Sequence, residues 1–489
     1  MTSPPATDPV LVIDCGTTRL KLSLVAPDGT VLVRQASEVP VQRDAEGLAW
    51  DGAVLGRCVL DGAAALLAGR RVAGVAIANQ RVSCLLWDAA TGAPLGPVLG
   101  WSDRRTRGLD RALRAQGLRH TPGLTGSKLR WLLDQADPER RRSRAGGLRA
   151  GTLDSWLLWL LSGGRLHLSD HVNAAQTGLF DVRRLAWDEA LAEALGVPPR
   201  ILPQPVPNTG PYGPARALPG APPLLAVIGD QQASLVGQGA LAPGACKITF
   251  GTVGVVNAVL GDAPLAAHSR DAFGNIACST PAGVLHGAES SMQSAGSAIE
   301  WLMRAGVLDE AAALDCLVDP CRRSGAVFVS ALEGLGAPHW KPAARAAFLG
   351  LDASDGRAEL CRAVLDGIAC AAAEILDRLE AVVGRPLGEI GLDGGLSASR
   401  AFQDILAATT GRPLRRAGST EATTRGAAAL AFAALQGLPP DRALPPPPGA
   451  GRVQPRDGTR PADRAAWAHA VQQVLATAAA PAAPATPLP

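Results

Sequence analysis

Short apolar runs that end in polar or small residues recur along the chain and predict buried strands. The clearest runs are residues 10–14, 72–78, 223–228, 247–250 and 390–393. The alternating segment 20–25 follows the first run, and Asp28-Gly29 indicates a hairpin turn before a strand at 31–34. Residues 84–88 are predicted to pair with 98–101. Polar residues at the ends of these strands are the first candidates for a site.

Segments with helical periodicity alternate with the predicted strands. The clearest are residues 55–67, 128–133, 152–161, 298–303, 359–383, 400–409 and 426–435. This alternation predicts an α/β fold. Residues 203–223 are rich in Pro and Gly and are expected to be irregular surface chain. Near the C-terminus we expect one helix at 461–476 and a disordered tail at 477–489.

The second half of the chain repeats the plan of the first. Residues 246–260 contain a β-type run, a Gly-Thr turn and a second apolar run, as residues 10–25 do. We infer a duplicated architecture in which each half presents a hairpin to phosphate. The 489 residues also exceed the size of a single core, so two domains are expected.

Composition adds few constraints. The net charge of +3 gives no reason to invoke nucleic acid or a membrane, and no apolar run approaches the length of a bilayer span. Nine scattered cysteines form no Cys-x-x-Cys pair, and the first ten residues do not resemble a signal peptide. We expect a soluble, cytoplasmic protein without nucleic-acid or membrane partners.

The segment DCGTTRLK, which begins at Asp14, is the first candidate site. The Asp14 carboxylate leaves a strand end, where it could hold a Mg²⁺-bound water, and Gly16 allows close approach of the backbone. The amides and hydroxyls of Thr17 and Thr18 could cradle phosphate oxygens, with Lys21 as a nearby positive charge. An ordinary hairpin is the alternative, and the related turn in the second half favours the functional interpretation.

Asp230 and Gly251-Thr252 lie in one stretch and carry complementary chemistry. Asp230 follows the strand at 223–228 and could accept a proton, whereas Gly251-Thr252 is a small-residue turn that could hold an anion. Together they predict a phosphotransfer site.

Four other segments are weaker candidates. Gly394-Gly395 could lie against a nucleotide, although a tight turn without function is favoured for Gly-Gly alone. Arg81 and Trp101 suit a hydroxyl-rich small molecule, and surface ion pairing is an equally good explanation. Gly296 could sit beside phosphate, although core packing of a small-residue helix over 289–297 is the stronger interpretation.

Ordered motifs over residues 10–435 resemble those of the FGGY carbohydrate kinases, most closely their glycerol kinase branch. The motifs begin at Asp14 (DCGTTRLK), Asn79 (NQRVSCLLWD), Gly123 (GLTGSKLRWLLD), Gly151 (GTLDSWLLWLLSGG), Gly229 (GDQQASLVGQG), Gly334 (GLGAPHW), Ala347 (AFLGLDASDGRAELCRAVLD) and Leu392 (LDGGLSASRAFQD). The resemblance implies two actin/hexokinase-like (ribonuclease H-like) domains, each with a mixed five-stranded sheet, around a central cleft. We place an N-terminal domain at 1–238, a C-terminal domain at 239–436 and an extension at 437–489.

The resemblance also implies a role for each matching residue. Asp230 would be the general base that accepts the proton of the attacking hydroxyl, and Asp14 would organise Mg²⁺. The residues that would hold ATP are Thr17, Gly251, Thr252, Gly296 and Gly395, with Ser399 near the base in place of an Asn. The acceptor pocket would be lined by Arg81, Trp101, Asp230 and Gln231.

Two departures bear on the acceptor. Glycerol kinases follow their Gln-Arg with a Glu that binds substrate hydroxyls, and this chain has Val82; they also have a pocket Tyr where this chain has Gly123. A hydrogen bond to a charged group contributes about 1.5–3 kcal/mol, so glycerol binding should weaken roughly tenfold to a hundredfold. The vacated volume should admit a longer polyol or a ketose. The regulatory sugar-phosphate loop of the bacterial enzyme has no counterpart in residues 210–223.

The predicted function is therefore ATP-dependent phosphorylation of a hydroxyl on a small polyol or sugar, with Mg²⁺. One alternative is a ketose kinase, such as a xylulose or ribulose kinase. Another is a non-catalytic, sugar-responsive ATPase on the same fold, which would not need the acceptor residues. Family members are commonly dimers or tetramers, so the resemblance allows a homodimer or homotetramer.

Overall fold

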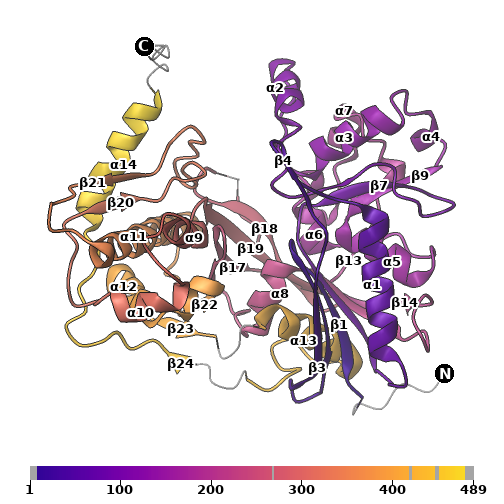
Figure 1. Cartoon of the computed structure of the whole chain (residues 1–489). Coiled ribbons are helices and arrows are strands. Elements are labelled where there is room, and N and C mark those ends of the chain that lie inside the picture. The colour runs from indigo at the N-terminus through magenta and orange to yellow at the C-terminus, as the bar shows by residue number, and fades with distance from the viewer. Residues whose placement is uncertain (1–7, 267–268, 418–420, 447–450, 480–489) are drawn as a thin grey trace.

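The computed structural model describes residues 8–266, 269–417, 421–446 and 451–479, which form two lobes side by side (Figure 1). Each lobe is built on its own mixed sheet with helices, so the predicted α/β architecture of two domains is confirmed. None of the helices in these ranges is long and apolar enough to cross a membrane.

A six-stranded sheet in the order β14-β15-β6-β1-β2-β3 forms the centre of the N-terminal lobe. Its strands are β1 (Val10–Cys15), β2 (Arg19–Val25), β3 (Val31–Glu38), β6 (Gly74–Asn79), β14 (Thr209–Pro214) and β15 (Pro223–Gly229). The predicted hairpin pairs β1 with β2, while β6 runs parallel to β1 and β15 runs parallel to β6. Parallel strands end at the same edge of a sheet, so the residues that follow β1, β6 and β15 come together.

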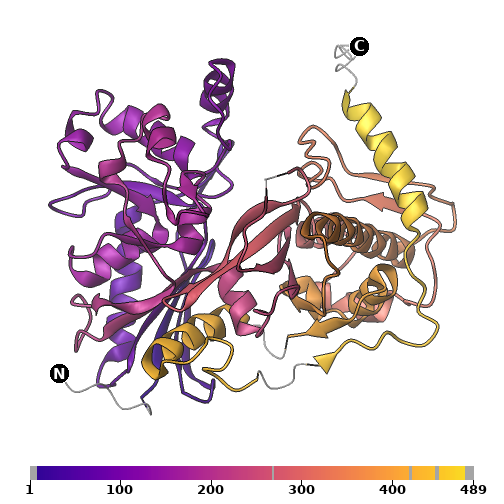
Figure 2. The ribbon, with the colours of Figure 1, turned by 180° about the vertical axis from the view of Figure 1, so that it is seen from behind.

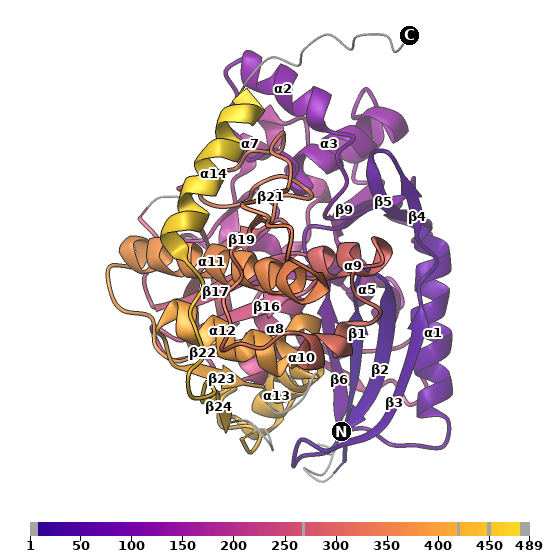
Figure 3. The ribbon, with the colours of Figure 1, turned by 60° about the vertical axis from the view of Figure 1, so that its left-hand side comes forward.

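Alternate residues of these strands bury the two faces of this sheet. Leu11 and Ile13 face α1 (Gly52–Leu67) and α5 (Leu153–Ser162), whereas Val10 faces the other layer. That second layer consists of α8 (Asp230–Gly237) and α13 (Ala422–Gln436). The late helix α13 therefore packs on strands from the start of the chain, as the gold helix against the indigo strands shows (Figure 2). Figure 3 shows α1 flanking β1, β2 and β3.

A second, five-stranded sheet in the order β4-β5-β8-β7-β9 extends the N-terminal lobe. Its strands are β4 (Gln42–Asp44), β5 (Gly47–Trp50), β7 (Cys84–Asp88), β8 (Val98–Leu99) and β9 (Leu148–Thr152). The helices of this region are α2 (Arg107–Ala115), α3 (Thr125–Ala136), α4 (Arg141–Arg144), α6 (His171–Ala175) and α7 (Glu189–Ala194). Its short strands outside the sheet are β10 (Leu168–Asp170), β11 (Phe180–Asp181), β12 (Ala186–Trp187) and β13 (Gln204–Val206). The predicted pairing of β7 with β8 is present, with Cys84 opposite Leu99.

The C-terminal lobe repeats the plan of the N-terminal lobe around a seven-stranded sheet in the order β18-β19-β17-β16-β22-β23-β24. Its strands are β16 (Cys246–Phe250), β17 (Gly254–Gly261), β18 (Phe273–Thr280), β19 (Gly283–Met292), β22 (Ile390–Asp393), β23 (Leu414–Arg416) and β24 (Gly451–Arg452). β16 and β17 form the second predicted hairpin, and β22 runs parallel to β16. One face packs on α9 (Gly296–Arg304), α11 (Arg357–Val383) and α12 (Arg400–Thr410). The inferred duplication is thus present in three dimensions.

Several details of the sequence-based interpretation are wrong. The sheets have six and seven strands rather than the five each that the resemblance implies, and β14, β18, β19, β23 and β24 were not predicted. Residues 209–214 pair with β15 despite their Pro and Gly content, since β14 is an edge strand with an irregular register. Residues 289–292 belong to β19, and the helix begins only at Gly296.

The predicted C-terminal helix is present as α14 (Arg464–Ala479), and it docks on the C-terminal lobe. Trp467 and Val471 pack against β20 (Val327–Val329), which pairs with β21 (Ala347–Leu349). Residues 477–479, which were expected to be disordered, complete this helix, and the rest of that tail lies outside the described residues. The short helix α10 (Leu314–Leu317) lies beside α11 and α12.

Candidate active site

The parallel strands of the N-terminal sheet bring three charged residues to one edge. Asp14 lies near the end of β1, Arg81 follows β6 by two residues, and Asp230 follows β15 directly as the first residue of α8. Gly229 lets the Arg81 side chain cross β15, because a β-carbon at Gly229 would lie 2.6 Å from Arg81 Cγ. The sequence prediction that strand ends carry the site is therefore consistent with the geometry.

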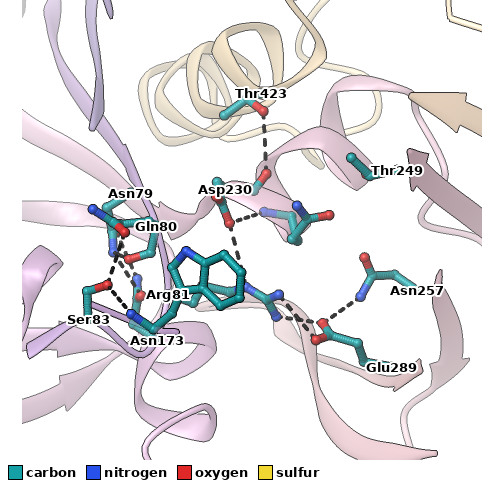
Figure 4. A network of polar contacts seen from close by, with 12 residues as sticks. Asn79, Gln80, Arg81, Ser83, Asn173, Asp230, Thr249, Asn257, Glu289 and Thr423 are labelled. Carbon is teal, nitrogen blue, oxygen red and sulfur yellow. Dashed lines mark hydrogen bonds and ion pairs between the residues drawn. The ribbon is translucent and has the colours of Figure 1, made fainter. Parts of the chain in front are cut away.

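Arg81 links the two lobes. Its Nε lies 3.6 Å from Asp230 Oδ1, and its terminal nitrogens donate to both carboxylate oxygens of Glu289 at 2.6 and 3.2 Å (Figure 4). Glu289 comes from β19 of the C-terminal lobe and was not identified from sequence. Asn257 on β17 donates to the same carboxylate at 2.8 Å. A bidentate Arg–carboxylate pair fixes orientation as well as charge, so this contact positions Arg81 between the lobes.

The Asp230 carboxylate has a raised pKa. Burial is the main cause, and it is opposed by Arg81, by the backbone N–H of Gln231 and by Lys247. The Gln231 N–H donates to Asp230 Oδ1 at 2.7 Å. A carboxylate that is more basic than usual and sits at the start of a helix has the properties of a general base.

Lys247 is a buried cation that the sequence analysis did not assign to the site. Its Nζ donates to Gln231 Oε1 at 3.0 Å and to Thr249 Oγ1 at 2.6 Å. Burial lowers its pKa to about 8, and the charges of Asp393 and Asp230 oppose this shift. The sequence did contain one indication that Lys247 is functional: it lies within a predicted buried strand, and full burial of Lys is rare without partners.

Burial raises the pKa of Asp14 to about 7, with Lys21 lowering it and Asp230 and Glu421 raising it. Lys21 Nζ lies 3.6 Å from Asp14 and 3.8 Å from Glu421. A buried carboxylate near other acids has unmet affinity for positive charge, which fits a Mg²⁺ ion. Across the described residues no three acidic, His or Cys side chains form a metal-binding group. If the chain binds Mg²⁺ here, Asp14 would hold it, with water and phosphate oxygens as the other ligands that Mg²⁺ prefers.

The hairpin residues after Asp14 lie beside the acceptor residues. The Trp101 Nε1–H donates to Thr17 Oγ1 at 3.2 Å, although the indole remains 38% exposed. Thr18 is exposed, and its carbonyl oxygen accepts a hydrogen bond from the Val39 N–H. Gln80 Oε1 accepts from Ser83 at 3.1 Å and lies 3.4 Å from Thr17 Oγ1. These contacts join the predicted phosphate hairpin to the predicted acceptor wall.

The structure brings three predicted nucleotide residues together in the C-terminal lobe. The Gly296 N–H donates to Gly251 O at 2.8 Å, and the Ser297 N–H donates to Thr252 O at 3.2 Å. A β-carbon at Gly296 would lie 2.7 Å from Gly251 O. The Gly-Thr turn and the start of α9 thus form one tightly packed backbone surface, which explains the glycine at position 296.

Gly395 lies at the same sheet edge, because β22 runs parallel to β16. Its neighbour Gly394 has a φ of +87°, and a β-carbon there would lie 2.5 Å from the Phe250 carbonyl. The Ser399 hydroxyl makes hydrogen bonds within the fold. It donates to Asp315 Oδ1 at 2.6 Å and accepts from the Phe402 N–H as the N-cap of α12. The Ser399 hydroxyl is therefore already used in the fold.

Val82 and Gly123 mark the departures at the acceptor wall. Val82 has a φ of +68°, which is strained for a β-branched residue, and its carbonyl accepts a hydrogen bond from Thr125 Oγ1 at 2.8 Å. A β-carbon at Gly123 would meet no atom within 4 Å. Position 82 is thus apolar where the resemblance implies a carboxylate, and Gly123 has open space where a side chain would be.

The two sheets, each with a glycine turn or an acid at the ends of its parallel strands, define a phosphotransferase fold of the actin and hexokinase type. Residues 9–237 match the N-terminal domain model of the FGGY family of carbohydrate kinases, and residues 246–435 match its C-terminal domain model. The chain belongs to this family and is an ATP-dependent kinase that acts on a hydroxyl group.

Individual relatives agree with this assignment. Glycerol kinase from Trichlorobacter lovleyi is 36% identical over 448 residues, which cover 87% of this chain and 90% of the relative. The structure of Plasmodium falciparum glycerol kinase with ADP superposes with a TM-score of 0.86 at 22% identity, covering 97% of this chain and 99% of that chain. A ligand-bound xylulose kinase from Lactobacillus acidophilus has a TM-score of 0.78 at 19% identity, covering 96% of each chain. These two structures share the fold.

Proposed function

We propose that this kinase transfers the γ-phosphoryl group of ATP to a primary hydroxyl of a small polyol or sugar other than glycerol. The observation that carries the proposal is the placement of Asp230, 3.6 Å from Arg81 Nε at the shared end of the parallel strands. In that position a carboxylate can take a proton from a hydroxyl while the guanidinium holds the same acceptor.

Positioning and electrostatics account for most of the catalysis expected here, because the transition state of phosphoryl transfer is loose. Asp230 would accept the proton of the attacking hydroxyl. Thr17, Gly251, Thr252 and Gly296 would hold ATP, and Gly395 would lie against the nucleotide. Mg²⁺ held through Asp14 would neutralise phosphate charge. Lys21 would add a positive charge on the same side.

Val82 argues against glycerol as the preferred acceptor. An apolar side chain cannot accept a hydrogen bond from a substrate hydroxyl, and a β-carbon at Gly123 would meet no atom within 4 Å. A longer acceptor fits both features, and a ketose kinase remains within this proposal. The expected cytoplasmic location rests on composition and sequence pattern, and the homodimeric or homotetrameric state rests on the family resemblance.

A coupled assay of ADP release over glycerol, tetritols, pentitols and ketopentoses tests the proposal. We expect an acceptor with more than three carbons to give the highest kcat/KM. The highest value with glycerol would contradict the interpretation of Val82. ADP release that none of these acceptors stimulates would instead support a non-catalytic, sugar-responsive ATPase.

A further inference from the structure

A group of polar side chains occupies the face of the C-terminal sheet that turns toward the N-terminal lobe. Asn257 on β17 lies opposite Glu289 on β19, and Phe273 on β18 lies opposite Glu289 on its other side. Asn275 is two residues along β18 from Phe273, and residues two apart point to the same face. The four side chains therefore share one face.

This face adjoins the proposed catalytic residues. Val259, two residues from Asn257, packs with Leu235 of α8, the helix that Asp230 begins. Glu289 binds Arg81, which in turn lies 3.6 Å from Asp230. The polar group therefore continues directly from the Asp230–Arg81 pair into the opposite lobe, as Figure 4 shows for Asn257 and Glu289.

The two asparagines have unused hydrogen-bonding capacity. Asn257 donates to Glu289, but its Oδ1 finds no hydrogen-bond partner among the described residues. Both polar side-chain atoms of Asn275 likewise have none within the described ranges. Each residue is only 3% exposed, and buried polar groups without partners are rare and costly.

Other buried asparagines close to the site are bonded. Asn79 and Asn173 exchange hydrogen bonds of 3.0 and 3.1 Å, and Asn173 also donates to Asp170 at 2.5 Å. Among the buried asparagines of the described residues, only Asn257 and Asn275 have unused amide atoms, although the buried glutamines Gln232, Gln238 and Gln403 each have one as well. An amide held in place with a free oxygen is suited to bind a hydroxyl group.

An apolar wall completes the arrangement. Phe273 is 38% exposed and contacts Trp340 edge-on, with ring centroids 5.6 Å apart. Gly287, opposite Asn275, leaves room for that amide, because a β-carbon there would lie 2.4 Å from Asn275 Oδ1. A few fixed polar groups beside aromatic surface are typical of small-molecule sites.

We propose that Asn257, Asn275 and Glu289 form a distal acceptor subsite, which binds hydroxyls on the carbons remote from the phosphorylated one. The acceptor is then an open-chain polyol or sugar with four or more carbons. This inference rests on the proposed function, because Asp230 fixes the end of the acceptor that receives phosphate. The subsite replaces, from the opposite lobe, the hydrogen-bond acceptor that Val82 does not provide.

The test compares kcat/KM for glycerol, erythritol and pentitols in the wild type, Asn257→Leu and Asn275→Val. We expect each variant to lose about tenfold in kcat/KM for the four- and five-carbon acceptors, mainly through KM. For glycerol, which Asp230 and Arg81 can hold alone, the change in Asn275→Val should stay within about twofold, because Asn275 makes no hydrogen bond to the Arg81–Glu289 pair. Asn257→Leu also removes a hydrogen bond to Glu289, so its effect is judged by the ratio of pentitol to glycerol activity. Asn257→Ser also removes the amide oxygen Oδ1 of Asn257, but unlike Asn257→Leu it does not introduce an apolar side chain.

Ser290→Ala is the matched control, because Ser290 is buried on the same strand as Glu289 but faces the other side of the sheet. It should leave the ratio of pentitol to glycerol activity unchanged. Calorimetric titration of the best acceptor without ATP should show the same weakening in the Asn257 and Asn275 variants.

The outcomes separate the two proposals. If the wild type prefers a longer acceptor and all variants keep that preference, the distal subsite is wrong and the proposed function stands. A wild type that prefers glycerol overturns both the subsite and the exclusion of glycerol from the proposed function, while the kinase activity itself stands. A wild type that phosphorylates no polyol or sugar overturns both.

Discussion

Gly237 of α8 and Gly426 of α13 touch where these two helices cross. A β-carbon at Gly237 would lie 1.9 Å from Ala422 O, and one at Gly426 would lie 1.8 Å from Ala233 O. Because α8 begins with Asp230, this close contact between the two helices helps to fix the position of the proposed base relative to the N-terminal sheet.

Replacing Gly426 with Ala should destabilise the protein by about 1–3 kcal/mol, since backbone cannot yield as a flexible side chain can. Urea unfolding monitored by circular dichroism measures the change. Gly108→Ala on α2 is the control, because a β-carbon there meets no atom within 4 Å and Ala is the better helix former. Equal stability of the two variants would contradict the close crossing.

Asp230→Asn should lower kcat by at least about a hundredfold, because the amide cannot accept the hydroxyl proton. ATP should still raise the melting temperature, since the proposed nucleotide contacts lie on other residues. Near-normal turnover in this variant would show that another group serves as the base.

Val82→Glu should raise kcat/KM for glycerol roughly tenfold to a hundredfold, by adding a charged hydrogen-bond acceptor. The substitution also replaces a β-branched residue at a φ of +68°. Val82→Gln relieves the same strain without the charge, so only the difference between the two variants reports the carboxylate. If Gln and Glu act alike, the charge is irrelevant.

Activity should fall on both sides of neutral pH. A raised pKa at Asp230 means that the base is lost by protonation at a higher pH than for an ordinary carboxyl. Lys247, with a pKa of about 8, is charged below that pH and loses its charge as the pH rises past it. The kcat/KM profile for the acceptor should therefore decline above pH 8.

Lys247→Met removes the titrating group and should abolish the alkaline decline, at a lower overall rate. A variant profile that still falls above pH 8 would assign that limb to a different residue.

The sequence predicted the hairpins at Asp14 and Gly251 because each combines a short apolar run with a small-residue turn. It did not predict Glu289, since a Ser-rich segment has no apolar alternation, and β19 exists only because it pairs with β17 and β18. Lys247 was likewise hidden in an apolar run. Contacts between lobes, such as Arg81 with Glu289, depend on folding of the whole chain and leave no local pattern.

The protein has only four lysines, Lys21, Lys128, Lys247 and Lys341. Lys128 and Lys247 are fully buried, whereas Lys341 is exposed and Lys21 is partly exposed beside Asp14. An amine-reactive label should therefore modify two lysine side chains in the folded protein, one of them next to the proposed phosphate hairpin. Mass spectrometry then measures the extent of labelling at Lys21 relative to Lys341, which serves as the internal reference. A lower ratio in the presence of ATP would show that the nucleotide protects the proposed phosphate hairpin.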